Sequence, residues 1–174
     1  AAARMSEPNG LCLLPAATAE RLGYDVVVAD TVNHVLRGLS STTGRVATIA
    51  GTGRQWMQGD RDEGPALAVP LSSPWDVVWL PDHGPSGSPG SLVVAMAGVH
   101  QLASVDPVSG TTTVLAGTTR EGLVDGQAAA SWLAQPSGLA LDTRDADVAA
   151  LWFVDAETSA LRRLAHGVVT TAVG

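Results

Sequence analysis

This sequence contains almost no cysteine and no long apolar run. Cys12 is the only cysteine among the 174 residues, which excludes an intrachain disulfide, a Cys-x-x-Cys redox pair and a cysteine-based zinc site within them. It lies in the apolar run Gly10–Leu14, so we expect a buried thiol of low reactivity. A single unpaired cysteine fits a cytoplasmic protein.

Positive charge is also scarce. The chain has 10 Lys and Arg residues against 17 Asp and Glu, and its formal net charge is -7. A negative chain repels phosphate backbones and anionic lipid surfaces, and no apolar run approaches the roughly 20 residues needed to cross a bilayer. We therefore expect neither nucleic acid nor a membrane among the partners of this chain.

The sequence does contain a threefold repeat of short strands. Asp30, Met96 and Asp155 occupy the same position in three blocks whose period is roughly 60 residues. Each block begins with a proline and a short apolar run, and it continues with β-branched runs that Asp, Asn and Gly residues separate. A repeat of this length that is built from strands is typical of a β-propeller.

The repeat predicts an all-β fold of three blades with four strands each. The first strands begin at Pro8, Pro74 and Pro136 and are expected to be innermost, while the fourth strands alternate Thr and Val and are expected to be outermost. The predicted blades cover residues 7–53, 73–119 and 135–174, and two connectors cover residues 54–72 and 120–134.

Two further predictions concern the links between strands. Each connector carries an acidic residue and a glycine ahead of an Ala-rich stretch, which predicts a turn and a single helical turn packed over one end of the blades. We call this end the mouth of the propeller. Residues 81–90 are rich in Pro, Gly and Ser and predict a mobile loop between the first two strands of the second blade.

The segments Ala29–Arg37, Thr48–Gly53 and Gln135–Ala140 resemble the NHL repeat family of β-propellers. The signature Ala-Asp-Thr-x-Asn-His is intact in the first block, and the spacing of the blocks extends the resemblance over nearly the whole chain. The connector segments 53–60 and 121–126 are similar to those of bacterial thioredoxin-like proteins with a C-terminal NHL propeller. The resemblance implies a six-bladed ring preceded by a thioredoxin-like domain.

Three blades make up half of the ring that the resemblance implies, and no Cys-x-x-Cys is present to carry thioredoxin-like redox chemistry. Half a ring leaves two blade faces uncovered, a kind of surface that soluble monomers avoid. We therefore expect the chain to be a fragment of a longer protein, or two copies of it to complete a ring.

Four residues at the turns between second and third strands are candidate ligands. Asp30 and Asp155 are equivalent, and a short carboxylate in such a turn either accepts backbone N–H groups or binds a ligand at the mouth. His34 and His100 are also equivalent, and they either begin a metal site or serve as turn-capping or surface histidines. Because Ser159 replaces them in the third block, we assign no metal site.

The first connector contains the best candidate for a contact surface. Trp56 is followed by the charged run 60–63, which includes Asp60 and Arg61, and aromatic residues bracketed by charge recur in protein interfaces. The alternative is a solvated charged loop. Arg37 and Arg162 are equivalent, and we expect them to form salt bridges rather than to act in catalysis.

These observations favour a non-catalytic scaffold that binds a protein or a small molecule through its mouth-side loops, with no cofactor and no catalytic residue. The alternative is that the chain is part of a metal-dependent lyase or lactonase, because the resemblance to NHL propellers implies a relation to propellers of this enzyme class. Its candidate ligands are Asp30, His34, His100 and Asp155, and it needs further blades to surround a metal.

Overall fold

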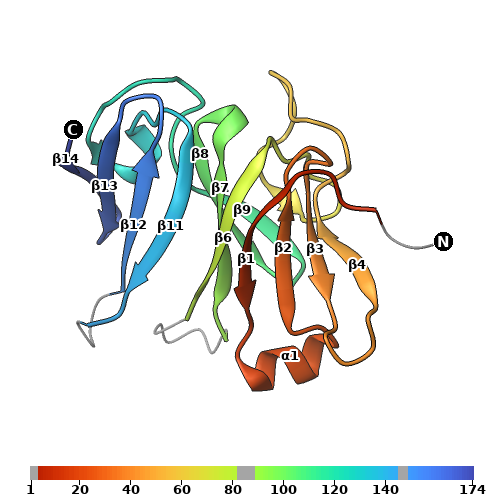
Figure 1. Cartoon of the computed structure of the whole chain (residues 1–174). Helices are drawn as coiled ribbons and strands as arrows, with labels where there is room; N and C mark the ends of the chain where they lie inside the picture. Colours follow the sequence, from red (N-terminus) through yellow and green to blue (C-terminus); the bar gives the residue numbers. More distant parts are fainter. Residues whose placement is uncertain (1–3, 82–88, 145–148) are drawn as a thin grey trace.

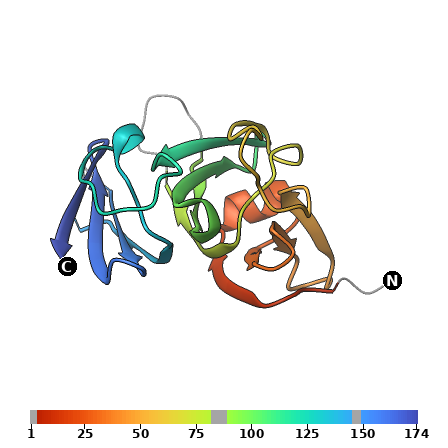
Figure 2. The ribbon, with the colours of Figure 1, turned by 90° about the horizontal axis from the view of Figure 1, so that it is seen from above.

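The computed structural model describes residues 4–81, 89–144 and 149–174 of the chain. Three antiparallel sheets follow one another along the sequence and stand side by side (Figures 1 and 2). Their first strands contact one another in turn, and these are β1 (Pro8–Leu13), β6 (Pro74–Leu80) and β11 (Pro136–Asp142). This is the arrangement of neighbouring propeller blades, so the predicted fold class is confirmed.

Each sheet contains the four strands that the repeat predicts, in their order along the chain. Runs rich in Val, Leu and Thr form these strands because such side chains pack well on a pleated, half-buried surface. The other strands are β2 (Val26–Asp30), β3 (Val35–Leu39) and β4 (Val46–Ala50) in blade 1, β7 (Ser91–Met96), β8 (Gln101–Asp106) and β9 (Thr111–Ala116) in blade 2, and β12 (Ala150–Asp155), β13 (Ala160–Ala165) and β14 (Val168–Val173) in blade 3.

The connectors add a fifth strand that the sequence did not predict. Strand β5 (Gly64–Pro65) pairs with β9 of blade 2, and β10 (Gly126–Gln127) pairs with β14 of blade 3. The 3-10 helix η2 (Ala128–Ala130) supplies the single helical turn expected in the second connector, and a second one, η1 (Ala97–Val99), lies between β7 and β8. Each connector thus covers part of the outer edge of the following blade, which limits pairing with another chain.

The backbone repeats as closely as the sequence does. Glu7, Ser73 and Gln135 directly precede the first strands, and their φ angles of 48°, 44° and 60° are all left-handed. A shift in strand register follows at the start of each first strand. Left-handed backbone is uncommon for residues other than glycine, so its recurrence at equivalent positions supports the alignment of the three blocks.

We call the face that packs against the preceding blade, in blades 2 and 3, the front face, and the face that packs against the following blade, in blades 1 and 2, the back face. The back face of blade 1 and the front face of blade 2 share a buried cluster that includes Leu36 and Val94. The back face of blade 2 and the front face of blade 3 share another, which includes Leu102 and Phe153. The core therefore lies between the blades, where burial of apolar surface stabilises the fold.

One carboxylate lies among the first strands. Asp76 in β6 accepts the N–H group of Leu139 in β11 through Oδ2 at 2.8 Å. Its side chain also lies so close to β1 that a Cβ atom on Gly10 would come within 2.1 Å of Oδ1. Gly10 and Gly138 are equivalent to Asp76 in the other two blades. The absence of a side chain at position 10 therefore makes room for the Asp76 carboxylate.

Helix α1 (Ala16–Leu22), between β1 and β2, was not predicted from the sequence. Ala19 and Leu22 pack against the cluster between blades 1 and 2, and the helix ends at Gly23 with a left-handed φ of 75°. The helix is short and follows Pro15 without a side-chain hydrogen bond at its start, so the usual capping signal is missing. It lies at the end of the blades opposite the connectors (Figure 1).

Cys12 is half-buried, and burial raises the pKa of its thiol to about 12, so the thiol stays protonated at neutral pH. The loop predicted at residues 81–90 falls largely on residues 82–88, which lie outside the described ranges. Among the residues described, no helix is long and apolar enough to cross a membrane.

Candidate functional site

Two equivalent carboxylates, Asp30 and Asp155, end the second strands of blades 1 and 3 and are completely buried. Asp30 Oδ1 accepts the N–H group of Ser6 at 2.8 Å, and Asp155 Oδ1 accepts the N–H group of Ala134 at 2.7 Å. Both donors lie in the segment that leads into the same blade. Of the two roles that the sequence left open, the structure therefore shows the first: the carboxylates accept backbone N–H groups. They connect the start of a blade to the turn between its second and third strands.

Asp30 is fully engaged in hydrogen bonds. Burial raises its pKa, but the hydrogen bonds from the Ser6 N–H group and from the Asn33 and Arg37 side chains lower it by more, so the pKa lies below its ordinary value. Arg37 Nε donates to Asp30 Oδ2 at 2.8 Å, which confirms the salt bridge predicted for this arginine. An ionised carboxylate with these partners has little capacity left for a ligand.

The equivalent arginine of blade 3, Arg162, is completely buried and holds the second connector in place. Its Nη1 donates to Asp155 Oδ2 at 2.8 Å and to the Trp132 carbonyl at 2.7 Å. Its Nη2 donates to the Val124 carbonyl at 3.0 Å and to Asp125 Oδ1 at 2.9 Å. The predicted salt bridge is confirmed, and its role is to bind a connector to the front face of its blade.

Blade 2 has no charge at these positions. Met96 and Ala103 stand where the other blades have the aspartate and the arginine, and both are buried. An apolar pair therefore fills the space of an ion pair. Since blade 2 folds without these charges, the ion pairs of blades 1 and 3 have a structural role and take no part in a reaction shared by the blades.

The two equivalent histidines join neighbouring blades. His34 Nδ1 accepts the N–H group of Ser73 at 3.1 Å, and His100 Nδ1 accepts the N–H group of Gln135 at 3.2 Å. Both donors are the left-handed residues that precede the first strand of the next blade. These imidazoles therefore do not cap their own turns. Each one links a turn of one blade to the residue that precedes the first strand of the following blade.

We expect the free energy of unfolding to fall as the pH drops below about 6.5, the ordinary pKa of histidine. Burial lowers the pKa of His34, so the unfolded state takes up a proton at a higher pH than the folded state. The contribution is complete above the unfolded pKa and is lost as the pH falls from there through the folded pKa. The loss should not exceed the value of one hydrogen bond, about 0.5–1.5 kcal/mol.

Urea unfolding at about pH 7.5 and about pH 5 measures this contribution. The pH dependence should be weaker for His34→Gln than for the unmodified chain. The matched control is His166→Gln, because His166 is exposed in the turn between β13 and β14 and should leave the dependence unchanged. An undiminished dependence in His34→Gln would show that other groups are responsible.

The candidate metal ligands do not converge. Asp30 and Asp155 are bound to arginines in different blades, and His34 and His100 each accept a backbone N–H group. Nowhere in the described ranges do three His, Cys, Asp or Glu side chains gather as a metal site requires. The ligand set considered for a lyase or lactonase is therefore not assembled by these blades.

Trp56, Asp60 and Arg61 do lie together, at one open hollow at the mouth. The hollow has a volume of about 740 Å³ and lies between the first connector and the mouth-side ends of β8 and β9. The sequence grouped the connector residues correctly. It gave no sign of Gln101 and Thr118, which come from blade 2 and reach the hollow only through the fold. The lining residues are Trp56, Gln58, Gly59, Asp60, Arg61, Asp62, Glu63, Gln101, Val114, Gly117, Thr118, Thr119 and Ala129.

Two carboxylates hold the wall of the hollow. Asp60 receives a two-fold hydrogen bond from Arg54, with both N···O distances 2.8 Å, and it accepts the N–H group of Met57 at 2.7 Å. The hydrogen bond from Arg54 is the main cause of the lowered pKa of Asp60. Glu63 Oε1 accepts the N–H group of Val114 at 3.1 Å, which fastens the loop to β9. Asp60 therefore shapes the loop rather than facing a ligand.

Three other lining residues carry polar atoms without a partner. Trp56 Nε1, Asp62 Oδ1 and Thr118 Oγ1 are shielded from solvent and make no hydrogen bond within the part of the chain that the structure describes. A buried polar group without a partner costs about 1–3 kcal/mol, and such groups are uncommon in folded proteins. Three residues that line one hollow thus carry a shielded donor, acceptor and hydroxyl that are unsatisfied in the described structure.

Known proteins of similar sequence include NHL repeat-containing proteins. Human NHL repeat-containing protein 2 is 35% identical over 169 residues, which cover 86% of this chain and 22% of the human protein. The Arabidopsis thaliana protein SUPPRESSOR OF QUENCHING 1, chloroplastic, is 35% identical over 140 residues, which cover 79% of this chain and 12% of that protein. The chain spans less than a quarter of the length of these relatives. No family model matches it.

Solved structures of similar shape agree with the fold. An auxiliary nutrient binding protein from Bacteroides ovatus superposes with a TM-score of 0.63 at 17% identity, covering 98% of this chain and 37% of that chain. A protein of the same description from Bacteroides thetaiotaomicron gives a TM-score of 0.62 at 16% identity, covering 84% and 34%. With the repeat motif, the blades and the sequence relatives together, the chain belongs to the NHL-repeat family of β-propellers.

Proposed function

We propose that this chain is a non-catalytic binding module whose mouth-side hollow takes a basic side chain of a partner protein. The observation that carries the proposal is the unsatisfied set of Trp56 Nε1, Asp62 Oδ1 and Thr118 Oγ1 around one hollow. After a small shift of the side chains that shield these atoms, a lysine or arginine side chain can donate to Asp62 Oδ1 and Thr118 Oγ1, and a backbone carbonyl of the partner can accept the N–H group of Trp56. Each new hydrogen bond relieves a cost of about 1–3 kcal/mol. That relief adds to the affinity.

The charges around the hollow favour a cation. Asp60 is neutralised by Arg54, so the remaining charges of the lining are Arg61 against Asp62 and Glu63, an excess of one negative charge. Asp62 has an oxygen without a partner in the described structure, and Glu63 uses one oxygen on the backbone of β9. The chain as a whole carries a net charge of -7, which draws cationic groups toward it. A lysine or arginine side chain supplies several donors for carboxylate oxygens and also packs well against an aromatic ring.

The comparisons support a binding role at the level of fold. The neighbours of similar shape include a protein described as nutrient binding, and rigid propellers commonly carry binding groups on the loops at one end. We further propose that the chain forms part of a longer polypeptide with a thioredoxin-like domain, as the resemblance of its connectors implies. The module then holds a partner for that polypeptide rather than reacting with it.

Titration of the ¹⁵N-labelled chain with a blocked Gly-Gly-Arg-Gly-Gly peptide tests the binding role. The indole N–H resonance of Trp56, assigned by its loss in Trp56→Phe, should shift and saturate, while that of Trp152 in blade 3 should not move. Asp62→Asn keeps the shape of the side chain and removes its charge. It should weaken binding at least about 10-fold, which corresponds to about 1.4 kcal/mol.

The matched control for the charge is Glu20→Gln, in helix α1 at the opposite end of the blades. It should leave the affinity unchanged. The same peptide with glutamate in place of arginine should not shift the Trp56 resonance. Equal shifts with both peptides, or a Trp56 resonance that does not respond to either, would remove the basis of the proposal.

A further inference from the structure

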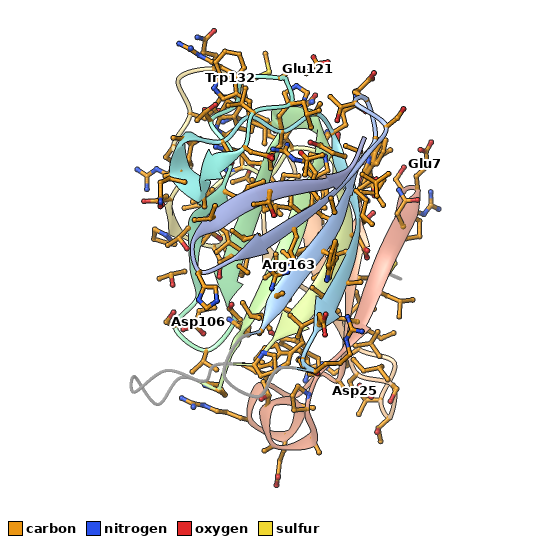
Figure 3. The ribbon with its side chains drawn as sticks, turned by 90° about the vertical axis from the view of Figure 1, so that its left-hand side faces the viewer. Glu7, Asp25, Asp106, Glu121, Trp132 and Arg163 are labelled. Atoms are coloured by element: carbon orange, nitrogen blue, oxygen red, sulfur yellow. The ribbon has the colours of Figure 1, made fainter. Side chains whose placement is uncertain are left out.

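Another hollow lies between blades 2 and 3, at the end of the blades opposite the mouth, and we call it the inter-blade hollow. It has a volume of about 180 Å³. Strand β6 ends beside it, at the end of the blades where helix α1 also lies (Figure 1). In Figure 3, Asp106 at the end of β8 marks this end, whereas Glu121 and Trp132 of the second connector mark the mouth. The inter-blade hollow is therefore separate from the one that takes the basic side chain.

Apolar side chains form the walls of the inter-blade hollow. They are Leu80 and Leu115 of blade 2, Leu151 and Leu164 of blade 3, and Ala128 of η2. All five are part of the buried cluster between these blades or pack against it. Among the described residues of the lining, His166 alone carries an ionisable side chain. A charged ligand would lose its hydration there without a carboxylate or a guanidinium to replace it, so the hollow suits an uncharged molecule.

Equivalent side chains form the same walls between blades 1 and 2. The residues that occupy the five positions are Leu14, Ile49, Ala66, Leu92 and Val105. All of them are part of the buried cluster between those blades or pack against it. Leu92 and Val105 stand directly opposite each other on β7 and β8, as Leu151 and Leu164 do on β12 and β13. The two interfaces therefore have matching walls, and they differ in what stands between these walls.

Large side chains occupy the space between the first pair of walls. Leu22 of α1, Tyr24 and Trp79 pack against the cluster between blades 1 and 2. The ring of Tyr24 lies so close to β3 that a Cβ atom on Gly38 would come within 2.8 Å of it. Burial also raises the pKa of Tyr24 to about 12. Two aromatic rings and one leucine thus complete this interface from within the chain.

The second interface lacks these side chains at the equivalent positions. Gly90 takes the position of Tyr24, and Leu141 takes the position of Trp79. Residues 81–90 link β6 to β7 as α1 and its flanking residues link β1 to β2, and they contain no apolar side chain larger than that of proline. The same walls therefore receive no aromatic ring from these positions, and a hollow lies between them.

We propose that the inter-blade hollow binds an uncharged molecule with a single aromatic ring, of about the size of toluene. An apolar cavity of about 150 Å³ stays dry and takes up benzene, and the volume here is about 180 Å³. The ring lies between blades 2 and 3 as the rings of Tyr24 and Trp79 lie between blades 1 and 2. It contacts both blades at once, so it replaces water along two apolar walls. The matching walls without their aromatic side chains carry the proposal.

Titration of the chain of residues 1–174 with toluene tests the site, with ¹³C labels in the leucine methyl groups. The methyl resonances of Leu80, Leu151 and Leu164 should shift and saturate. Those of Leu14 and Leu92 should not move, because these leucines stand at the equivalent places in the interface that already holds aromatic side chains. Each resonance is assigned by its loss in a single leucine-to-methionine variant.

Ala128→Leu should weaken the binding of toluene at least about 10-fold, because the added side chain takes up the space of the ligand. The backbone of Ala128 donates to the Gly167 carbonyl and accepts the Gly117 N–H group. The substitution leaves both hydrogen bonds in place, so the variant should fold as the unmodified chain does, which far-UV circular dichroism checks. The matched control is Ala130→Leu, since Ala130 is exposed in the same 3-10 helix and should leave the affinity unchanged.

Leu164→Ala makes the opposite change, because it enlarges the hollow. This variant should bind indole, which has two fused rings, more tightly than toluene, whereas the unmodified chain should prefer toluene. Benzoate and benzylammonium carry the same single ring with a charge. They should bind at least about 10-fold more weakly than toluene, because the apolar walls cannot replace their hydration.

Three outcomes would overturn the proposal. One is that the resonances of Leu80, Leu151 and Leu164 do not respond up to the solubility limit of toluene. Another is that those of Leu14 and Leu92 shift to the same extent, since toluene would then enter the apolar interior without preference. The third is an Ala128→Leu variant that binds toluene as tightly as the unmodified chain. The arginine peptide that tests the mouth-side hollow should leave all these resonances unchanged, so the two proposals are tested separately.

Discussion

Replacement of Arg162 by alanine is expected to lower the free energy of unfolding by about 3–5 kcal/mol, the range for breaking a buried ion pair by removing one partner. The Arg162 guanidinium is completely buried and binds Asp155, Asp125 and two connector carbonyls. Without it, the buried carboxylate of Asp155 keeps only the Ala134 N–H group as a hydrogen-bond partner. The loss is a large part of the roughly 5–15 kcal/mol that stabilises a typical domain.

Urea unfolding followed by tryptophan fluorescence measures the effect. The matched control is Arg37→Ala in blade 1, since Arg37 is 20% exposed and Asp30 keeps hydrogen bonds from Ser6 and Asn33. Its expected cost is about 1.5–3 kcal/mol, the range for one hydrogen bond to a charged group. An equal loss in the two variants would show that burial of the pair does not set the cost.

The double variant Asp155→Met with Arg162→Ala tests the cause. It reproduces in blade 3 the apolar pair that Met96 and Ala103 form in blade 2. It should be more stable than Arg162→Ala alone, because no buried charge is left without a partner, and the coupling energy should lie between about 0.5 and 3 kcal/mol. A double variant less stable than the single one would place the cost in the lost connector contacts instead.

Gly51→Ala is expected to be the other severely destabilising change. Gly51 follows β4 with a left-handed φ of 90°, and a Cβ atom there would lie 2.4 Å from the His34 carbonyl oxygen. Left-handed backbone in a residue with a side chain costs about 1–3 kcal/mol, and the forced shift of the neighbouring strand costs about 1–3 kcal/mol more. Gly117 has the same surroundings, with a Cβ 2.4 Å from the His100 carbonyl oxygen.

Thermal and urea unfolding of Gly51→Ala and Gly117→Ala measure this cost. The control is Gly44→Ala, because Gly44 has a left-handed φ of 69° but no atom within 4 Å of the added Cβ. It separates the cost of the backbone angle from the cost of the clash. If all three variants lost the same free energy, the close approach to the carbonyl oxygens would be unimportant.

The architecture was largely readable from the sequence because the repeat fixes the positions of equivalent strands. Three blocks with the same order of apolar runs and turn residues predicted the three sheets, and the equivalent positions of Asp30, Met96 and Asp155 placed the turns between second and third strands. The salt bridges of Arg37 and Arg162 followed from their matching positions. The features of the fold that lie within a blade and recur in the other blades could therefore be predicted.

The contacts that join the blades could not be predicted from the sequence in the same way. The acceptors for Ser73 and Gln135 are imidazoles 39 and 35 residues earlier in the chain, and the hollow combines Trp56 of a connector with Gln101 and Thr118 of blade 2. These contacts depend on how the sheets pack, and a local pattern carries no information on that. The two-residue strands of the connectors were missed because they are too short to produce a period.

Asp76 limits how freely the blades can be exchanged. Its carboxylate fills the space beside Gly10 and binds the backbone of Leu139, so blades 1 and 3 both contact one side chain from the blade between them. A copy of blade 2 in the place of blade 1 would bring a second carboxylate into the space that Gly10 leaves open. A copy of blade 1 in the place of blade 2 would leave the Leu139 N–H group without its acceptor. The blades share one fold, but their order along the chain is part of what the sequence encodes.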